Sequence, residues 1–145
     1  MPTGAKGILV VDDESADINA MRRALETARQ YTIFVASNYA EAADVFSIHG
    51  DAIVLALLDV TLPGKNGVEL AKHLLEVKPS LRVVFVSGHV GASVIRFYGI
   101  NAGDEHFLQK PFDGATLLRR VRRALESQKP LQRTLSHADA ASKIE

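Results

Sequence analysis

The stretch ILVVDDES, residues 8–15, decides the fold, because four aliphatic residues run directly into three acids. Consecutive apolar residues without polar alternation predict a strand that is covered on both faces, as in a parallel sheet. The acids that follow repel one another and are costly to desolvate. The arrangement therefore indicates that a positive group normally lies among them.

Four further apolar runs predict the other strands of the same sheet. The first run begins at Gly7, and the others are residues 31–36, 53–58, 82–86 and 105–108. Segments of helical length separate them. Strand and helix thus alternate five times, which predicts an α/β protein with an open, doubly wound parallel sheet, right-handed crossovers and helices on both faces.

The intervening segments carry helix signals. Asn38 precedes Glu41 by three residues, and Asn66 precedes Glu69 by three, which is the spacing of an N-terminal cap with a reciprocal acid. Three apolar stripes at helical spacing predict faces that are directed at the core. They are Ile18, Met21, Leu25 and Ala28; Val68, Ala71, Leu74 and Leu75; and Leu117, Leu118, Val121 and Leu125, with Arg119, Arg120, Arg122 and Arg123 mostly outside.

Length and composition predict a single soluble domain. The chain has 145 residues, which suits one core. Its 17 basic and 17 acidic residues leave no net field for nucleic acid or an anionic membrane surface. It has no cysteine, and its longest apolar run, residues 52–58, is too short to span a bilayer. We interpret the chain as cytoplasmic, with residues 1–127 as the domain and residues 128–145, which follow the last helical pattern, as a linker or C-terminal tail.

Polar side chains stand where the predicted strands end. The first strand ends in Asp12 and Asp13, the third in Asp59 and the fourth in Ser87, and the fifth reaches Lys110. Ligands of open parallel sheets bind outside these carboxyl ends. Carboxylates are hard ligands that suit Mg²⁺, and a carboxylate can attack phosphorus to form an aspartyl phosphate. A hydroxyl and an ammonium then suit the phosphoryl oxygens.

Simpler interpretations stay open for each residue alone. Asp12 and Asp13 could cap the first helix, where acids favour the helix dipole. Lys110 by itself is typical of a surface residue, and the serine at 87, followed by glycine, of a plain turn. Only the ordered set of strand ends favours a common phosphate and metal site.

Rival sites fit less well. The first strand is not followed by the glycine-rich turn of a dinucleotide or flavin site, and Lys65 lacks the glycine and hydroxyl neighbours of a P-loop. A dehalogenase-type phosphatase would carry a second aspartate where Thr61 stands. The five histidines show no metal-ligand spacing, so we interpret His49, His73 and His106 as surface or partly packed residues.

The chain resembles the receiver domains of two-component response regulators over roughly residues 6–126. Four motifs carry the resemblance: VDDE at 11–14, LDVTLPGKNG at 58–67, VSG at 86–88 and FLQKPF at 107–112. The resemblance implies a flavodoxin-like fold with strand order 2-1-3-4-5. It also implies that a histidine kinase or phosphotransfer domain phosphorylates Asp59.

The resemblance further implies a role for each matching residue. Mg²⁺ would be held by Asp12, Asp13 and Asp59 together with the backbone carbonyl of Thr61. Lys110 would pair with the phosphoryl group, and the peptide between Lys110 and Pro111 would be cis.

The switch of the family would use the hydroxyl of Ser87 and an aromatic residue three positions before the lysine. That residue is often tyrosine and here is Phe107, whose ring can swing inward but has no hydroxyl to donate. Partner binding would change through the face formed by helix 4, strand 5 and helix 5.

The resemblance also implies the partners of a signalling module and little enzymatic activity. The domain would be no enzyme beyond promoting its own phosphorylation and dephosphorylation, and the last helix offers a surface for a homodimer or an attached domain. Residues 83–112 also resemble receivers attached to hybrid sensor histidine kinases. Direct binding to nucleic acid is not expected, because there is no appended recognition helix. The alternative function is a receiver-like interaction module that works without phosphorylation.

Overall fold

The structure, a computed structural model, describes residues 5–88, 91, 93–94, 96 and 105–127. The elements are β1 (Lys6–Val11), α1 (Ser15–Glu26), β2 (Tyr31–Ala36), α2 (Tyr39–His49), β3 (Ile53–Asp59), α3 (Gly67–Val77), β4 (Arg82–Ser87), β5 (Phe107–Gln109) and α5 (Gly114–Ser127). All strand pairs are parallel, in the order β2-β1-β3-β4-β5. The predicted fold class and strand order are confirmed.

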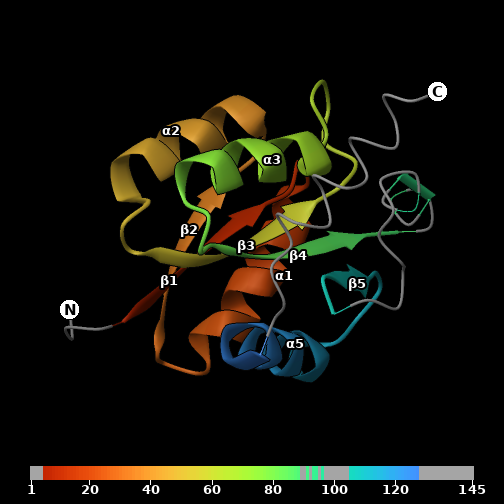
Figure 1. The fold of residues 1–145 in the computed structure, drawn as a ribbon. Coiled ribbons are helices and arrows are strands. Elements are labelled where there is room, and N and C mark those ends of the chain that lie inside the picture. The colour runs from red at the N-terminus through yellow and green to blue at the C-terminus, as the bar shows by residue number, and fades with distance from the viewer. Residues whose placement is uncertain (1–4, 89–90, 92, 95, 97–104, 128–145) are drawn as a thin grey trace.

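The sheet lies between two layers of helices, with α2 and α3 on one face and α1 and α5 on the other (Figure 1). The side chains of β1, β3 and β4 are buried almost throughout, as expected for strands covered on both faces. One hydrophobic cluster, including Phe46 and Leu74, fills the space under α2 and α3. A second, including Met21 and Leu117, fills the space under α1 and α5.

Both predicted N-terminal caps are present, with one difference. Asn66 accepts the backbone N–H of Glu69 at 3.0 Å, and the Glu69 carboxylate accepts the N–H of Asn66 at 3.1 Å, which completes a capping box. Asn38 accepts the N–H of Glu41 at 2.9 Å. The Glu41 carboxylate, however, accepts the backbone N–H and the hydroxyl of Ser37, each at 2.8 Å, so this cap is not reciprocal.

Three expectations need correction. The last strand is Phe107–Gln109, because β5 pairs only with the final three residues of β4. Ala28 lies beyond the end of α1, so its contribution to the helical stripe is lost. His106, expected at the surface or partly packed, is buried, since it directly precedes β5 and its carbonyl accepts the N–H of Phe85 at the sheet edge.

Two predictions fall outside the described part of the chain. Most of the segment between β4 and β5, where the alternation predicts the fourth helix, is not described, and neither are residues 128–145. Among the helices that are described, none is long and apolar enough to cross a membrane.

Candidate functional site

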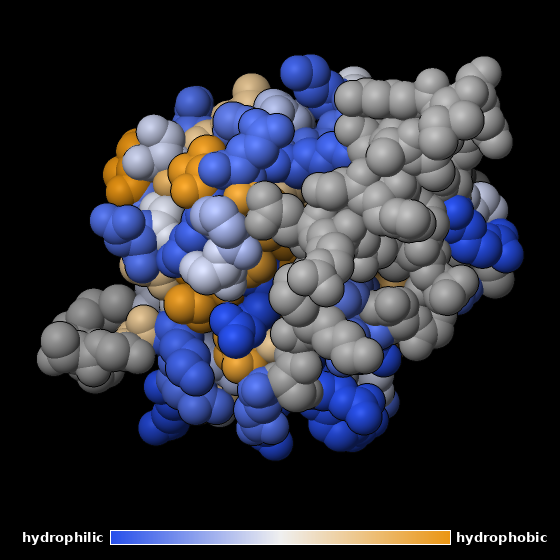
Figure 2. Space-filling view, in the orientation of Figure 1, coloured by the Kyte–Doolittle hydropathy of each residue, from blue (hydrophilic) through white to orange (hydrophobic). Residues whose placement is uncertain are grey.

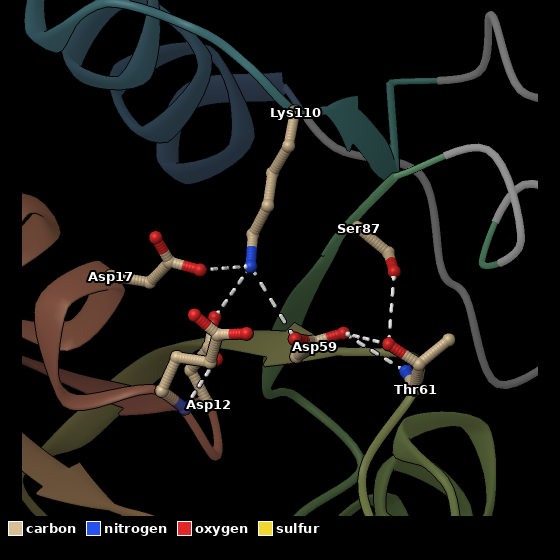
Figure 3. Close-up of polar contacts among 7 residues, drawn as sticks. Asp12, Asp17, Asp59, Thr61, Ser87 and Lys110 are labelled. Carbon is tan, nitrogen blue, oxygen red and sulfur yellow. Dashed lines mark hydrogen bonds and ion pairs between the residues drawn. The ribbon is translucent and has the colours of Figure 1, made fainter.

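The strand register brings the predicted site residues to one edge of the sheet. Asp12 lies level with Asp59, because the residues directly before these two aspartates are paired. Asp59 in turn lies beside the residue before Ser87, and Ser87 lies beside the residue before Lys110. Side chains from four distant parts of the sequence therefore converge above the carboxyl ends of four strands (Figure 3).

Three of the predicted site residues form an acidic group. Ligand oxygens of Asp12, Asp13 and Asp59 all lie within 4.8 Å of one another. Asp12 is fully buried and Asp59 is 4% exposed, whereas Asp13 faces solvent. Burial raises the pKa of Asp12, and the nearby charge of Asp59 adds to this, although hydrogen bonds from Lys110 and Glu14 oppose the rise. A close set of carboxylate oxygens, one of them open to water, suits a hard divalent cation.

Lys110 is the positive group that the acids at the end of β1 require. Its Nζ lies 2.7 Å from Asp12 Oδ2, 2.7 Å from Asp17 Oδ2 and 3.4 Å from Asp59 Oδ2. Burial alone would lower the pKa of Lys110, but the hydrogen bonds to Asp12 and Asp17 and the charge of Asp59 outweigh this and raise it well above its ordinary value. Lys110 therefore stays an ammonium.

The sequence patterns did not predict Asp17 as a residue of the site. It lies in the first turn of α1, where an acid is ordinary because it favours the helix dipole. Its distance from Lys110 along the chain, 93 residues, hides the contact. The sequence signal was an acid one turn beyond the acidic loop, which by itself could not be told from a plain helix acid.

Thr61 contacts Asp59 in a way that the resemblance did not imply. Its backbone N–H donates to Asp59 Oδ1 at 2.9 Å, and its hydroxyl donates to the same oxygen at 3.0 Å. The Thr61 hydroxyl also lies 3.4 Å from the hydroxyl of Ser87. One oxygen of Asp59 thus faces N–H and O–H donors, while the other faces the ammonium of Lys110.

Two glycines allow the backbone to pass close to these residues. A Cβ on Gly67, the first residue of α3, would lie 2.2 Å from the carbonyl oxygen of Asp59. A Cβ on Gly91 would lie 2.2 Å from the hydroxyl oxygen of Ser87. Larger residues at either position would displace a strand end that carries a site residue.

Asp12 does not cap the first helix, because the N-cap position is Glu14 and no side chain of the described residues caps that end of α1. Its Oδ1 accepts the backbone N–H of Glu14 at the start of α1, at 2.9 Å. Its Oδ2 accepts from Lys110. Asp12 therefore stabilises the loop before α1 and also belongs to the charged site. The peptide between Lys110 and Pro111 is cis, as the resemblance implied.

Phe107 lies outside this charged cluster, in the core. Its side chain is 2% exposed and belongs to the hydrophobic cluster under α2 and α3. Its carbonyl accepts a hydrogen bond from the guanidinium of Arg120 in α5. Arg120, expected outside, is therefore partly buried and joins α5 to β5.

Comparison with known proteins identifies the family of this site. Residues 8–122 match the family described as the response regulator receiver domain. The chain is a response regulator receiver domain. It thereby belongs to two-component signalling systems, which bears out the resemblance seen in the motifs.

Curated relatives match this chain over different shares of their own length. The chain is 33% identical over 118 residues to the aerobic respiration control protein ArcA of Escherichia coli, covering 81% of this chain and 48% of ArcA. It is 35% identical over 124 residues to the response regulator MprA of Mycobacterium avium, covering 85% of this chain and 52% of MprA. It is 31% identical over 126 residues to the sensor kinase CckA of Brucella abortus, covering 87% of this chain and 13% of CckA. The receiver thus spans about half of the first two proteins and a small part of the third.

Solved structures agree. A CheY-like receiver domain protein from Methanospirillum hungatei is 28% identical with a TM-score of 0.68, and the match covers 83% of this chain and 94% of that protein chain. The receiver domain of NtrX from Brucella abortus is 31% identical with a TM-score of 0.64, and the match covers 83% and 99%.

Proposed function

We propose that Asp59 accepts a phosphoryl group from a phosphohistidine of a histidine kinase or phosphotransfer domain. A carboxylate oxygen of Asp59 attacks phosphorus, an O–P bond forms, the P–N bond breaks, and its electron pair returns to the imidazole nitrogen. The observation that carries this is the set of donors around Asp59. Thr61 at 2.9 and 3.0 Å, and Lys110 at 3.4 Å, surround a carboxylate that is almost buried.

We propose Mg²⁺ as the cofactor of this step. The carboxylates of Asp12, Asp13 and Asp59, together with the backbone carbonyl of Thr61, would hold it, and the close spacing of the three acids supports this donor set. When bound, Mg²⁺ supplies positive charge that offsets the carboxylates and the phosphoryl oxygens. The chain itself holds the phosphoryl group through Lys110 and orients Asp59 through Thr61.

The position of Ser87 supports a role in a conformational switch. Its hydroxyl lies near that of Thr61, at 3.4 Å, within reach of a group carried by Asp59. We infer that Ser87 moves toward the phosphoryl group and that the ring of Phe107 responds. Because phenylalanine has no hydroxyl, the response depends on ring packing alone. It would reach partners through the face of the fourth helix, β5 and α5, where the contact between Arg120 and the carbonyl of Phe107 joins two of these elements.

The domain limits and partners are proposals as well. We propose residues 1–127 as the receiver and residues 128–145 as a linker or tail. The domain is a phosphoacceptor in the cytoplasm that promotes only its own phosphorylation and dephosphorylation. The last helix joins it to an attached domain or a second copy, without direct contact with nucleic acid.

Incubation with a small phosphodonor and Mg²⁺ tests this function. Mass spectrometry should find one added phosphoryl group that is stable to acid and labile to base. The Asp59→Asn variant should remain unmodified, whereas Asp51→Asn, which removes an exposed acid in the turn before β3, should be modified like the wild type. Modification that persists in Asp59→Asn would show another acceptor. No modification of the wild type would favour the alternative, an interaction module that works without phosphate.

A further inference from the structure

The ammonium of Lys110 is shared among three carboxylates in the unphosphorylated protein. An ammonium has three N–H donors, and these face Asp12 at 2.7 Å, Asp17 at 2.7 Å and Asp59 at 3.4 Å. The contact with the phosphoacceptor is thus the longest of the three. A phosphoryl group on Asp59 can therefore bond Lys110 closely, or through more than one N–H, only if the ammonium moves away from Asp12 or Asp17.

Asp17 differs from the other two carboxylates in its role. Asp12 and Asp59 belong to the acidic group whose oxygens are spaced to hold a cation, and Asp17 does not. Its side chain contacts Lys110 and lies on the opposite side of the ammonium from Thr61 and Ser87 (Figure 3). Asp17 therefore draws Lys110 away from the place where a phosphoryl group would lie.

Exposure also sets Asp17 apart. Its side chain is 39% exposed, against 0% for Asp12 and 5% for Asp59. Water can replace Lys110 as its partner at small cost, so the pair can open without stranding a buried charge. The same pairing with Asp12 could not open so readily, because Asp12 would be left buried without a cation.

We propose that Asp17 competes with the phosphoryl group for Lys110 and so weakens the phosphorylated state. This inference rests on the proposed phosphorylation of Asp59 and adds a residue that sets its strength. Two effects act in the same direction. The Asp17 carboxylate occupies one N–H donor, and its negative charge repels the doubly negative phosphoryl group. Asp17 is a positioning residue, because its contact is with Lys110 and not with the reacting atoms.

The test measures binding of beryllofluoride, a phosphoryl mimic, to the full chain with Mg²⁺ at saturation, by ¹⁹F NMR. The Asp17→Asn variant should bind about two- to fivefold more tightly, the fold-change expected from loss of one partly exposed ion pair. Asp17→Glu keeps the charge and should return toward wild-type affinity. Glu14→Gln is the matched control, because Glu14 is exposed, has the same charge and precedes the same helix but does not face Lys110. It should change affinity less than Asp17→Asn.

Each other outcome overturns the inference. Unchanged or weaker binding by Asp17→Asn would show that Asp17 does not compete, and an equal gain in Glu14→Gln would assign the effect to overall charge. A structure of the complex in which Lys110 contacts both a fluoride and Asp17 would likewise exclude competition. If the wild type neither binds beryllofluoride nor takes up a phosphoryl group, the proposed function itself fails. Normal phosphorylation of the wild type with no effect of Asp17→Asn would overturn this inference alone.

Discussion

Replacement of Gly67 by alanine tests how closely the fold and the site depend on each other. Gly67 begins α3, directly after the loop that follows Asp59. An added Cβ would lie 2.2 Å from the carbonyl oxygen of Asp59, 2.9 Å from its carbonyl carbon and 3.0 Å from the Cα of Val60. All three atoms belong to the backbone, so no side-chain rotation can relieve the contact.

Two opposing effects decide the sign of the change in stability. Alanine is favoured over glycine in a helix by about 0.5–1 kcal/mol. Overpacking a filled site costs about 1–3 kcal/mol, and a contact at 2.2 Å against backbone belongs near the upper end of that range. We therefore expect Gly67→Ala to lower the free energy of unfolding by about 1–2 kcal/mol. Because the end of β3 must move, the variant should also take up a phosphoryl group more slowly.

Urea unfolding gives the stability, and phosphorylation by a small donor gives the rate. Gly114→Ala is the matched control, because Gly114 also begins a helix but its added Cβ would meet only the side chain of Ala24, at 3.2 Å. That variant should unfold within about 0.5 kcal/mol of the wild type. Wild-type stability or greater in Gly67→Ala would refute the reasoning, and so would equal losses in both variants.

Three further predictions concern charge and metal. Asp12→Asn should stabilise the metal-free protein near neutral pH. Burial raises the pKa of Asp12 in the folded protein. The protonated carboxyl therefore contributes stability to the fold at low pH, and this contribution is lost as the pH rises through the folded pKa. Wild-type stability should therefore fall relative to the variant as the pH rises above the ordinary pKa of an aspartate in urea titrations, and a constant difference would contradict this. Lys78→Met should cost about 1–3 kcal/mol, because the Lys78 ammonium donates to the carbonyls of Gly50 at 2.9 Å and Ile53 at 2.7 Å; an unchanged urea midpoint would argue against that role. Mg²⁺ at ten times its dissociation constant should stabilise the wild type by about 1.4 kcal/mol. Calorimetry should show a smaller gain at the same Mg²⁺ concentration for Asp13→Asn, and an equal gain would remove Asp13 from the metal site.

The surface also has a basic groove and an exposed apolar patch. Thr116, Arg119, Arg120, Arg122, Arg123 and Glu126 line a groove of about 400 Å³ on α5. Ile48 and Val77, which are 75% and 62% exposed, lie near the ends of α2 and α3 beside a second hollow. Figure 2 shows strongly hydrophilic residues over much of the visible surface, with separate apolar patches between them.

Local patterns in the sequence were sufficient for the fold class, whereas the strand order was implied by the resemblance to receiver domains. Apolar runs without alternation marked strands buried on both faces, and the caps at Asn38 and Asn66 fixed where two helices begin. These features depend on residues close together in the chain, so they can be read directly. Errors came where a short element depends on its neighbour, as for β5, whose length is set by pairing with β4.

The residue set of the site could also be predicted, because parallel strands bring their carboxyl ends to one edge and the chain places an acid, a hydroxyl or a lysine at four of them. The sequence therefore determined that the groups at the strand ends meet. Tertiary structure decided how their hydrogen bonds are distributed. Asp12 and Asp17 lie nearer to Lys110 than Asp59 does, and Thr61 donates its N–H and hydroxyl to Asp59. Asp17 enters the site for the same reason. Its contact with Lys110 depends on how α1 packs against the sheet, a distance of a few ångströms that no spacing along the chain encodes.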